Sequence, residues 1–421
     1  MSSPAGAAND APRPRVDARR DAQGEQGEQG QAWTMLALLS LAELLGMALW
    51  FTGSAVAPEL QLRWALTDPQ VGGLSTAVQL GFVLGTAASA VLNLADIVPA
   101  RRLFAWAAVG GALANALLLI APGYGAALAS RALAGAFLAG VYPPAMKMAA
   151  TWFRARRGIA VGTVVGALTV GKASPYLWRL VPEATLGDVV ITSSLMALAA
   201  AALIALCWRD GPFAFPSRPF SWGLVGEVIG SRRWRLATGG YLGHMAELYS
   251  YWTWIPAFVA ASALVSGGAV GARAPWVGWL SFGTIAVGGL GCLWGGILSD
   301  RVGRERLVTI AMAASGACAL AIGLLFGRSP WLLAPVALAW GFFVIADSAQ
   351  FSVLVTESVP AHAVGTALTV QVSLGFLLTT LTIQMVPPLV ARVGWEGAFA
   401  LLAVGPALGI LSIRRLRTSA A

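Results

Sequence analysis

Long apolar stretches separated by short polar breaks run through almost the whole chain. Twelve of these stretches approach the length of about 20 residues that a helix needs to cross a membrane. The breaks between them are rich in turn-forming residues, such as Ala-Pro-Gly at 121–123 and Arg-Ser-Pro at 328–330. The expected spans are 33–57, 69–94, 103–121, 124–152, 158–181, 188–208, 236–265, 276–298, 307–327, 331–356, 364–388 and 397–413. The pattern therefore predicts an all-α membrane protein with twelve transmembrane helices.

Two polar segments interrupt this pattern. Residues 1–32 contain the low-complexity run GEQGEQGQ, and we expect them to form a disordered cytoplasmic N-terminus rather than a secretory signal. The longest internal break, 209–235, is the predicted cytoplasmic linker. It divides the spans into a six-helix bundle at 33–208 and a second one at 236–415, followed by a short tail at 416–421.

Composition and charge agree with a membrane protein. The chain is 57% hydrophobic and only 11% charged, whereas a soluble domain carries about 25% charged residues, so a soluble enzyme and a disordered protein are excluded. The net charge of +9 reflects topology, and we expect no nucleic-acid partner. With the N-terminus inside, 20 of the 28 cations fall in cytoplasmic segments and five outside. This bias predicts a multi-pass protein of the inner membrane with both termini in the cytoplasm.

The two halves of the chain repeat each other at an offset of 204 residues. Ala-Glu-Leu occurs at 42–44 and again at 246–248, and Trp50, Gly85 and Asp96 align with Trp254, Gly289 and Asp300. Parallel six-helix repeats are one recurrent transporter architecture, in which the substrate site lies near the midplane between the halves.

Residues 296–306 read Gly-Ile-Leu-Ser-Asp-Arg-Val-Gly-Arg-Glu-Arg. This segment resembles the signature loop of the major facilitator superfamily, G-x-L-x-D-R-x-G-R-x-R. Gly303 allows a tight turn, and Asp300 is suited to a neighbouring helix N-terminus. The first-half copy, LNLADIVPARR at 92–102, is degenerate. The resemblance implies a gating loop between the halves, formed by Asp96, Arg101, Arg102, Asp300, Arg301, Gly303 and Arg304.

Span 4 also resembles this family, because Arg131 is followed by Gly135 and Gly140. The resemblance implies two pseudo-symmetric six-helix bundles, a monomer, and transport by alternating access. It also links the buried Arg131 to proton coupling.

Six ionisable residues lie inside expected spans, where a charge costs at least roughly 2.5–3.5 kcal/mol. They are Glu43, Arg131, Lys172, His244, Glu247 and Asp347. Glu43, Glu247, Asp347 and Arg131 are the candidates for proton coupling. The candidates for substrate binding are Lys172, His244 and the aromatic residues Trp50, Tyr176, Tyr251 and Trp254, most of which share helical faces with these charges. Alternatively, each charge only pairs with a neighbour and stabilises the bundle.

Other chemistry finds no support in the sequence. The run at 166–173 nearly matches a phosphate-binding loop, but Ala173 lacks the required hydroxyl and the run lies inside a span. We therefore expect no cofactor, no metal and no enzymatic activity. The sequence favours a proton-coupled secondary transporter of a small polar organic solute, with an inclination towards an organic anion. The alternatives are a drug or metabolite exporter of the same fold, a non-transporting receptor and an intramembrane enzyme.

Overall fold

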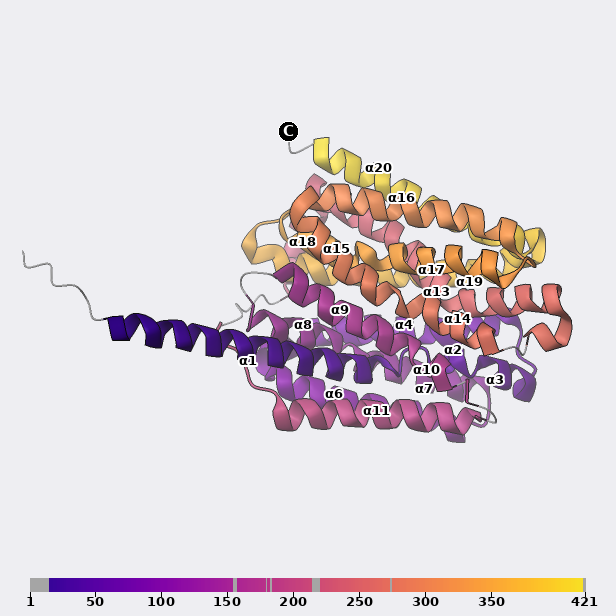
Figure 1. Cartoon of the computed structure of the whole chain (residues 1–421), viewed down its shortest axis with the longest axis horizontal. Helices are drawn as coiled ribbons and strands as arrows, with labels where there is room; N and C mark the ends of the chain where they lie inside the picture. The colour runs from indigo at the N-terminus through magenta and orange to yellow at the C-terminus, as the bar shows by residue number, and fades with distance from the viewer. Residues whose placement is uncertain are drawn as a thin grey trace, which may run out of the picture.

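The computed structural model of the chain describes residues 15–153, 157–178, 180–181, 184–213, 220–272 and 275–418. These described residues form long helices that run side by side, and none of them forms a β-strand (Figure 1). The prediction of an all-α protein is confirmed.

The first part of the chain supplies eleven helices and one 3₁₀ helix. They are α1 (Arg15–Met47), α2 (Thr52–Ala55), α3 (Ala57–Trp64), α4 (Asp68–Val91), α5 (Leu94–Ile97), α6 (Ala100–Ala116), η1 (Leu117–Ile120), α7 (Tyr124–Leu138), α8 (Tyr142–Ala150), α9 (Arg157–Ala173), α10 (Pro175–Trp178) and α11 (Leu186–Cys207).

The second part begins with α12 in the segment between the two expected bundles. Its elements are α12 (Trp222–Gly230), α13 (Arg232–Ala272), α14 (Pro275–Ala286), α15 (Gly288–Val302), α16 (Arg304–Ile322), η2 (Gly323–Leu325), α17 (Pro330–Ala346), α18 (Ser348–Thr356), η3 (Ala361–Ala363), α19 (Val364–Ala398), η4 (Phe399–Ala403) and α20 (Val404–Thr418).

Each of the twelve expected spans corresponds to one of these helices or to a consecutive pair. Ten segments of the described chain are long and apolar enough by themselves to cross a membrane. The last of them, Ala361–Thr418, contains both of the final expected spans, which are joined through Gly394 with a positive φ of 69°. The expected span 158–181 is split between α9 and α10 and is too short in each part to be counted. The structure is therefore consistent with twelve spans.

Helix α1 begins well before the first expected span. We expected disorder over residues 1–32, but the structure describes helix from Arg15 onward, and Figure 1 shows this helix extending beyond the rest of the bundle. Ala, Arg, Gln and Glu are all good helix formers, so a polar stretch next to a spanning helix can continue it. Residues 1–14 lie outside the described residues.

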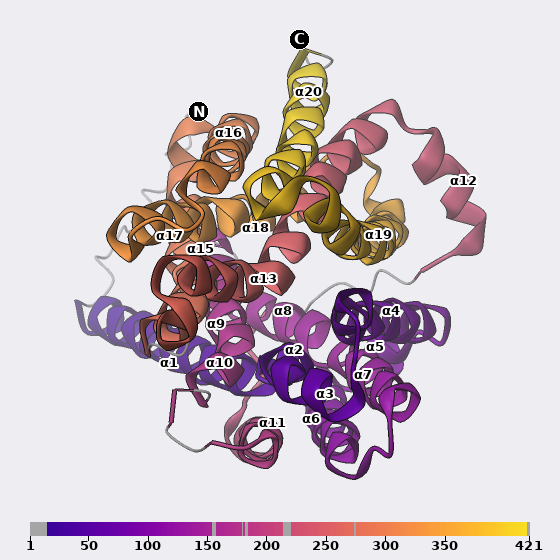
Figure 2. The same cartoon turned by 90° about the vertical axis from the view of Figure 1, so that its right-hand side faces the viewer.

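The helices gather into two groups that follow the order of the chain. Figure 2 shows α1–α11 in the lower part of the view and α13–α20 in the upper part. Helix α9 packs against α15, and α4 packs against α19, so these two contacts join the halves. The first contact is close because both helices are rich in glycine: Gly158, Gly162 and Gly166 of α9 lie against the backbone carbonyls of Gly296, Cys292 and Gly289.

Several spanning helices are broken near their middle. The break between α1 and α2 covers residues 48–51, and Ser174 separates α9 from α10 ahead of Pro175. Val287 separates α14 from α15, and Asp347 separates α17 from α18. A broken helix frees backbone carbonyls, which is tolerated at membrane depth only where the protein buries them or a cavity reaches them. The breaks therefore mark the interior region in which a site is expected.

Candidate functional site

Two cavities enter the structure from opposite ends of the helix bundle, and residues from both halves line each of them. The first, the Tyr176 cavity, has a volume of about 820 Å³ and is lined by Ser54, Tyr176 and Trp254 among others. The second, the Asp300 cavity, has a volume of about 490 Å³ and is lined by Val165 and Asp300 among others. We refer to the corresponding ends of the protein as the Tyr176 end and the Asp300 end.

Lys172 lies between these cavities. It stands on the same α9–α10 segment as Val165 and Tyr176, about 10 Å along the helix from the first and about 6 Å from the second. Its side chain is only 4% exposed. A path from one cavity to the other along this segment therefore passes Lys172.

Three aromatic rings surround the Lys172 ammonium. Nζ lies 4.1 Å from the ring centroid of Trp50, 5.0 Å from that of Tyr249 and 5.1 Å from that of Trp252. It also donates a hydrogen bond of 2.7 Å to the hydroxyl of Tyr249. Cation–π contacts of this kind stabilise a buried ammonium without neutralising its charge. The positive charge therefore remains available to an anion.

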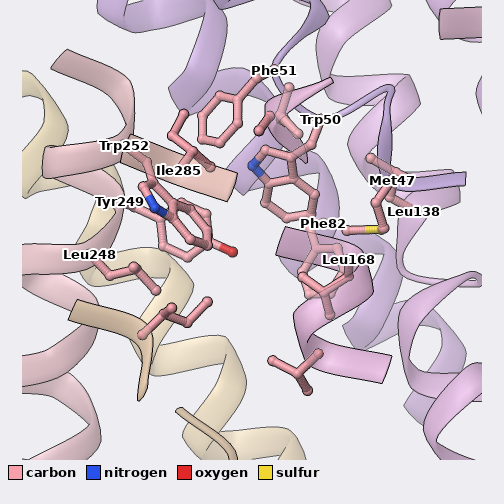
Figure 3. Packing of buried hydrophobic residues seen from close by; sticks show 14 of the residues in the cluster. Met47, Trp50, Phe51, Phe82, Leu138, Leu168, Leu248, Tyr249, Trp252 and Ile285 are labelled. Carbon is pink, nitrogen blue, oxygen red and sulfur yellow. The ribbon is translucent and has the colours of Figure 1, made fainter. Parts of the chain in front are cut away.

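The rings continue into a larger cluster, which we call the aromatic cluster and define as Trp50, Phe51, Phe82, Tyr176, Tyr249, Trp252 and Phe376. Figure 3 shows Trp50 and Phe82 on one side and Tyr249 and Trp252 on the other, with the Tyr249 hydroxyl pointing into the space between them. The cluster closes the region between the two cavities.

Glu43 is an acidic residue close enough to Lys172 for their charges to interact. Its side chain is fully buried, and neither carboxylate oxygen has a hydrogen-bond partner among the residues that the structure describes. Its charge interacts electrostatically with that of Lys172. Helices α1 and α9 come this close because Gly171 packs directly on the Leu44 carbonyl. The site therefore contains a buried cation and a buried carboxyl group without fixed hydrogen bonds.

Arg131 occupies a different place. It is fully buried and donates to the Leu49 carbonyl (2.6 Å), the Trp50 carbonyl (3.2 Å) and Asn115 Oδ1 (2.6 Å). The first two are carbonyls of the break between α1 and α2, so the arginine satisfies groups that the broken helix leaves free. Arg131 thus holds the backbone of Trp50, whose ring covers Lys172.

Glu247, His244 and Asp347 each contact partners within the second half. Glu247 accepts hydrogen bonds from Ser315 Oγ (2.9 Å) and Trp340 Nε1 (2.8 Å). His244 Nδ1 lies 2.9 Å from Asp347 Oδ1, and both side chains are buried. The repeat aligns Glu43 with Glu247, yet only Glu247 has hydrogen-bond partners in the part of the chain that the structure describes.

The remaining predicted aromatic residues are divided between the cluster and its surroundings. Tyr176 joins the cluster through Phe51, at a centroid distance of 6.5 Å. Trp254 lines the Tyr176 cavity and donates to the Ile383 carbonyl. Tyr251 packs on Trp340 within the second half and donates to the Ala337 carbonyl, so the structure does not bring it to Lys172.

The predicted gating loop lies at the Asp300 end. Gly303 separates α15 from α16 with φ of 87°, which confirms the turn expected from the motif. A side chain at Gly158, in the first turn of α9, would approach the Asp300 carboxylate within 3.4 Å, so Asp300 lies at this helix N-terminus. Arg304 donates to Glu357 over 2.7 Å within the second half.

The first-half loop is organised differently. Arg101 donates to the Ala205 carbonyl near the end of α11. Arg102 and Arg301 are exposed. Asp96 lies on α5, and its side chain is outside the described residues.

The sequence named Glu43, Lys172, Trp50 and Tyr176 as candidates but missed most of the aromatic cluster. Phe51, Phe82, Tyr249, Trp252 and Phe376 were not predicted, although each is buried. A buried aromatic residue in a membrane span has no sequence signal that distinguishes a site from ordinary packing. The contacts between the halves supply the missing information. No group of three or more His, Cys, Asp or Glu side chains in the described ranges is placed to hold a metal ion.

Comparisons with known proteins identify this architecture. The sequence matches the profile of the Major Facilitator Superfamily over residues 38–383. A comparison with curated proteins gave no match. Among solved structures, the chain is similar to a bacterial homologue of the human lysosomal transporter Spinster, in an inward-facing and unoccupied conformation. The TM-score is 0.66 at 15% identity, over 92% of this chain and 98% of that one.

A second similar structure is the transporter FucP in its outward conformation. The TM-score is 0.65 at 14% identity, over 90% of this chain and 98% of the other. At these identities the structural likeness shows the fold alone. The family match, however, covers most of the sequence. The chain therefore belongs to the major facilitator superfamily of membrane transporters.

Proposed function

We propose that the protein is a proton-coupled secondary transporter of a small organic anion. The observation that carries this proposal is the burial of Lys172 beside Glu43, in the closed region between two cavities that open at opposite ends. Lys172 binds the anion, and Glu43 carries the proton. Rocking of the halves exposes this pair first to one cavity and then to the other.

Charge balance supports the coupling. Without substrate, the buried pair of Glu43 and Lys172 adds no net charge, whether both groups are ionised or both are neutral. When a monovalent anion pairs with Lys172, a charged Glu43 would leave one net negative charge buried, which is costly at membrane depth. Protonation of Glu43 removes this charge. One proton therefore crosses with each monovalent anion.

Glu43 suits this role better than Glu247 does. A proton carrier changes its charge during the transport cycle, and hydrogen bonds to fixed partners would oppose that change. Glu43 makes no hydrogen bond to any described residue, whereas Glu247 already accepts two. Asp347 is paired with His244 and is a second candidate proton site.

The orientation of the protein in the membrane follows from its cations. With the Asp300 end in the cytoplasm, 20 of the 28 Lys and Arg residues lie on the cytoplasmic side. The Tyr176 cavity then opens to the outside of the inner membrane.

The test is uptake into proteoliposomes with a panel of radiolabelled acids, namely lactate, succinate and benzoate, under an imposed pH gradient. The wild-type protein should accumulate at least one acid when the lumen is alkaline. Glu43→Gln should retain exchange of labelled for unlabelled acid but lose accumulation. Glu227→Gln is the matched control, because Glu227 is an exposed carboxylate on α12.

Three outcomes would contradict the proposal. Full gradient-driven accumulation by Glu43→Gln would remove Glu43 from the coupling step. Expulsion of the acid, rather than its accumulation, under the same gradient would establish an exporter that exchanges substrate for protons. Binding without any flux would establish a receptor.

A further inference from the structure

The rings of the aromatic cluster come from both halves of the protein. Trp50 and Phe82 belong to the first half, and Tyr249 and Phe376 belong to the second. The contacts between the halves have centroid distances of 5.8 Å for Trp50–Tyr249, 5.8 Å for Trp50–Phe376 and 4.6 Å for Phe82–Phe376. The two halves thus meet through ring-to-ring contacts, and Trp50 and Tyr249 of this contact both cover Lys172. Figure 3 shows Trp50 and Tyr249 facing each other.

These contacts have to break when the halves rock apart. Each ring then loses a neighbour, and the apolar faces that it covered are left without a partner. A substrate restores the lost contact only if it presents a flat, polarisable face to both halves. An aromatic ring does this, whereas a hydroxylated chain or a sugar does not.

The polar groups near the Lys172 ammonium include the Tyr249 hydroxyl, the Glu43 carboxyl group, the Cys292 thiol and the indole of Trp252. Trp252 Nε1 is buried and has no hydrogen-bond acceptor among the described residues. A buried donor without a partner costs free energy unless a ligand supplies an acceptor. A carboxylate has one oxygen for Lys172 and a second oxygen for this N–H.

We propose that the substrate is a monovalent aromatic carboxylate whose ring stacks between Trp50 and Phe376 and whose carboxylate pairs with Lys172 and Trp252. This inference rests on the proposed function and narrows its substrate class. The cluster also disfavours a cationic substrate, because Lys172 already occupies the space over the rings that a cation would take.

Matched probes test the ring and the charge separately. Benzoate carries both, cyclohexanecarboxylate carries the charge on a saturated ring of similar size, and benzamide carries the ring without the charge. Competition against [¹⁴C]benzoate uptake into proteoliposomes gives the relative affinity of each probe. Benzoate should bind about three- to tenfold more tightly than cyclohexanecarboxylate, as expected for lost aromatic stacking, and benzamide should not compete.

Variants assign the discrimination to named residues. Trp50→Leu should bring the benzoate to cyclohexanecarboxylate ratio close to one, and Lys172→Met should abolish binding of both acids. Trp222→Leu, on α12 and 71% exposed, is the matched control and should leave the ratio unchanged. Phe376→Leu provides a second test of stacking if Trp50→Leu does not fold, and the ratio in the wild-type protein is decisive by itself.

The outcomes separate this inference from the proposed function. Equal or tighter binding of cyclohexanecarboxylate, with proton-coupled uptake of the acids retained, overturns the aromatic class alone. If benzamide competes as strongly as benzoate does, the proposal that the substrate carries a carboxylate paired with Lys172 is overturned. Proton-independent flux of every acid in the panel overturns the coupling in the proposed function, and the probe ratio still decides the substrate class.

Discussion

The glycine contact between α9 and α15 provides a direct test of how the halves move. Gly162 faces the backbone of Cys292, and a Cβ atom added at Gly162 would lie only 2.9 Å from the Cys292 carbonyl oxygen. Ordinary van der Waals contact at such a position needs 3.4–4 Å. Gly162→Ile would therefore force α9 and α15 apart by about half an ångström for the Cβ alone, and further for the rest of the side chain.

The direction of this effect follows from the position of the contact. Gly158, Gly162 and Gly166 run from the Asp300 end towards Lys172, and Gly158 lines the Asp300 cavity. A wedge there disfavours every state in which the Asp300 end is closed. Overpacking costs about 1–3 kcal/mol, which corresponds to about a 5- to 150-fold shift towards states open at the Asp300 end.

The assay is pulsed electron–electron double resonance, which measures the distance between spin labels placed on opposite halves. In a background in which Cys207, Cys292 and Cys318 are replaced by serine, exposed positions 102 and 306 report on the Asp300 end. Positions 62 and 331, each 88% exposed, report on the Tyr176 end. Gly162→Ile should lengthen the distance at the Asp300 end and shorten it at the Tyr176 end.

The control is Gly125→Ile on α7, where an added Cβ meets nothing within 4 Å. Gly162→Ala should give a smaller shift of the same sign. An unchanged distance distribution in a folded Gly162→Ile protein, or a shift towards opening at the Tyr176 end, would refute the assignment of this contact to closure of the Asp300 end.

Three further tests examine the charged groups. Arg131→Lys should lower the melting temperature and weaken substrate binding, because one ammonium cannot replace the guanidinium hydrogen bonds to the Leu49 and Trp50 carbonyls and to Asn115. A wild-type melting curve would contradict this positioning role. Glu247→Gln should lower the free energy of unfolding in denaturant by about 1–3 kcal/mol, because one buried donor loses its acceptor. The ratio of protons to substrate transported should stay unchanged. Loss of the dependence on the pH gradient would instead identify Glu247 as a proton carrier. In a double-mutant cycle on the free energy of unfolding, Arg304→Gln and Glu357→Gln should show a coupling energy of less than about 1 kcal/mol, because both side chains are half exposed. A larger coupling energy would indicate a buried ion pair that holds the loop in place.

Local sequence was sufficient for the architecture. A spanning helix is defined by its own apolar length, so the twelve expected spans each correspond to described helices. The turn at Gly303 was likewise predictable, because a positive φ at a helix boundary favours glycine. The helix from Arg15 was missed because its polar composition is compatible with both disorder and helix, and the adjacent spanning helix decides between them.

The sequence also identified which charges deserved attention, because a charge inside a span is costly wherever it lies. It could not distinguish their roles. The repeat makes Glu43 and Glu247 equivalent, yet Glu247 accepts bonds from Ser315 and Trp340, residues that lie 68 and 93 positions away along the chain. Hydrogen-bond partners at such separations are set by helix packing, and periodicity within one helix carries no record of them.

The sequence by itself therefore determined the multi-pass helical fold and the position of Lys172 and Glu43 inside long apolar segments. Only the tertiary structure decided that Lys172 lies under Trp50, Tyr249 and Trp252 and that Arg131 holds the broken end of α1. The physical reason is that the free-energy cost of placing a charge inside an apolar helix depends only on that residue and its own helix, so it can be recognised from local sequence. An aromatic site between two halves depends instead on rings from separate helices meeting at one place.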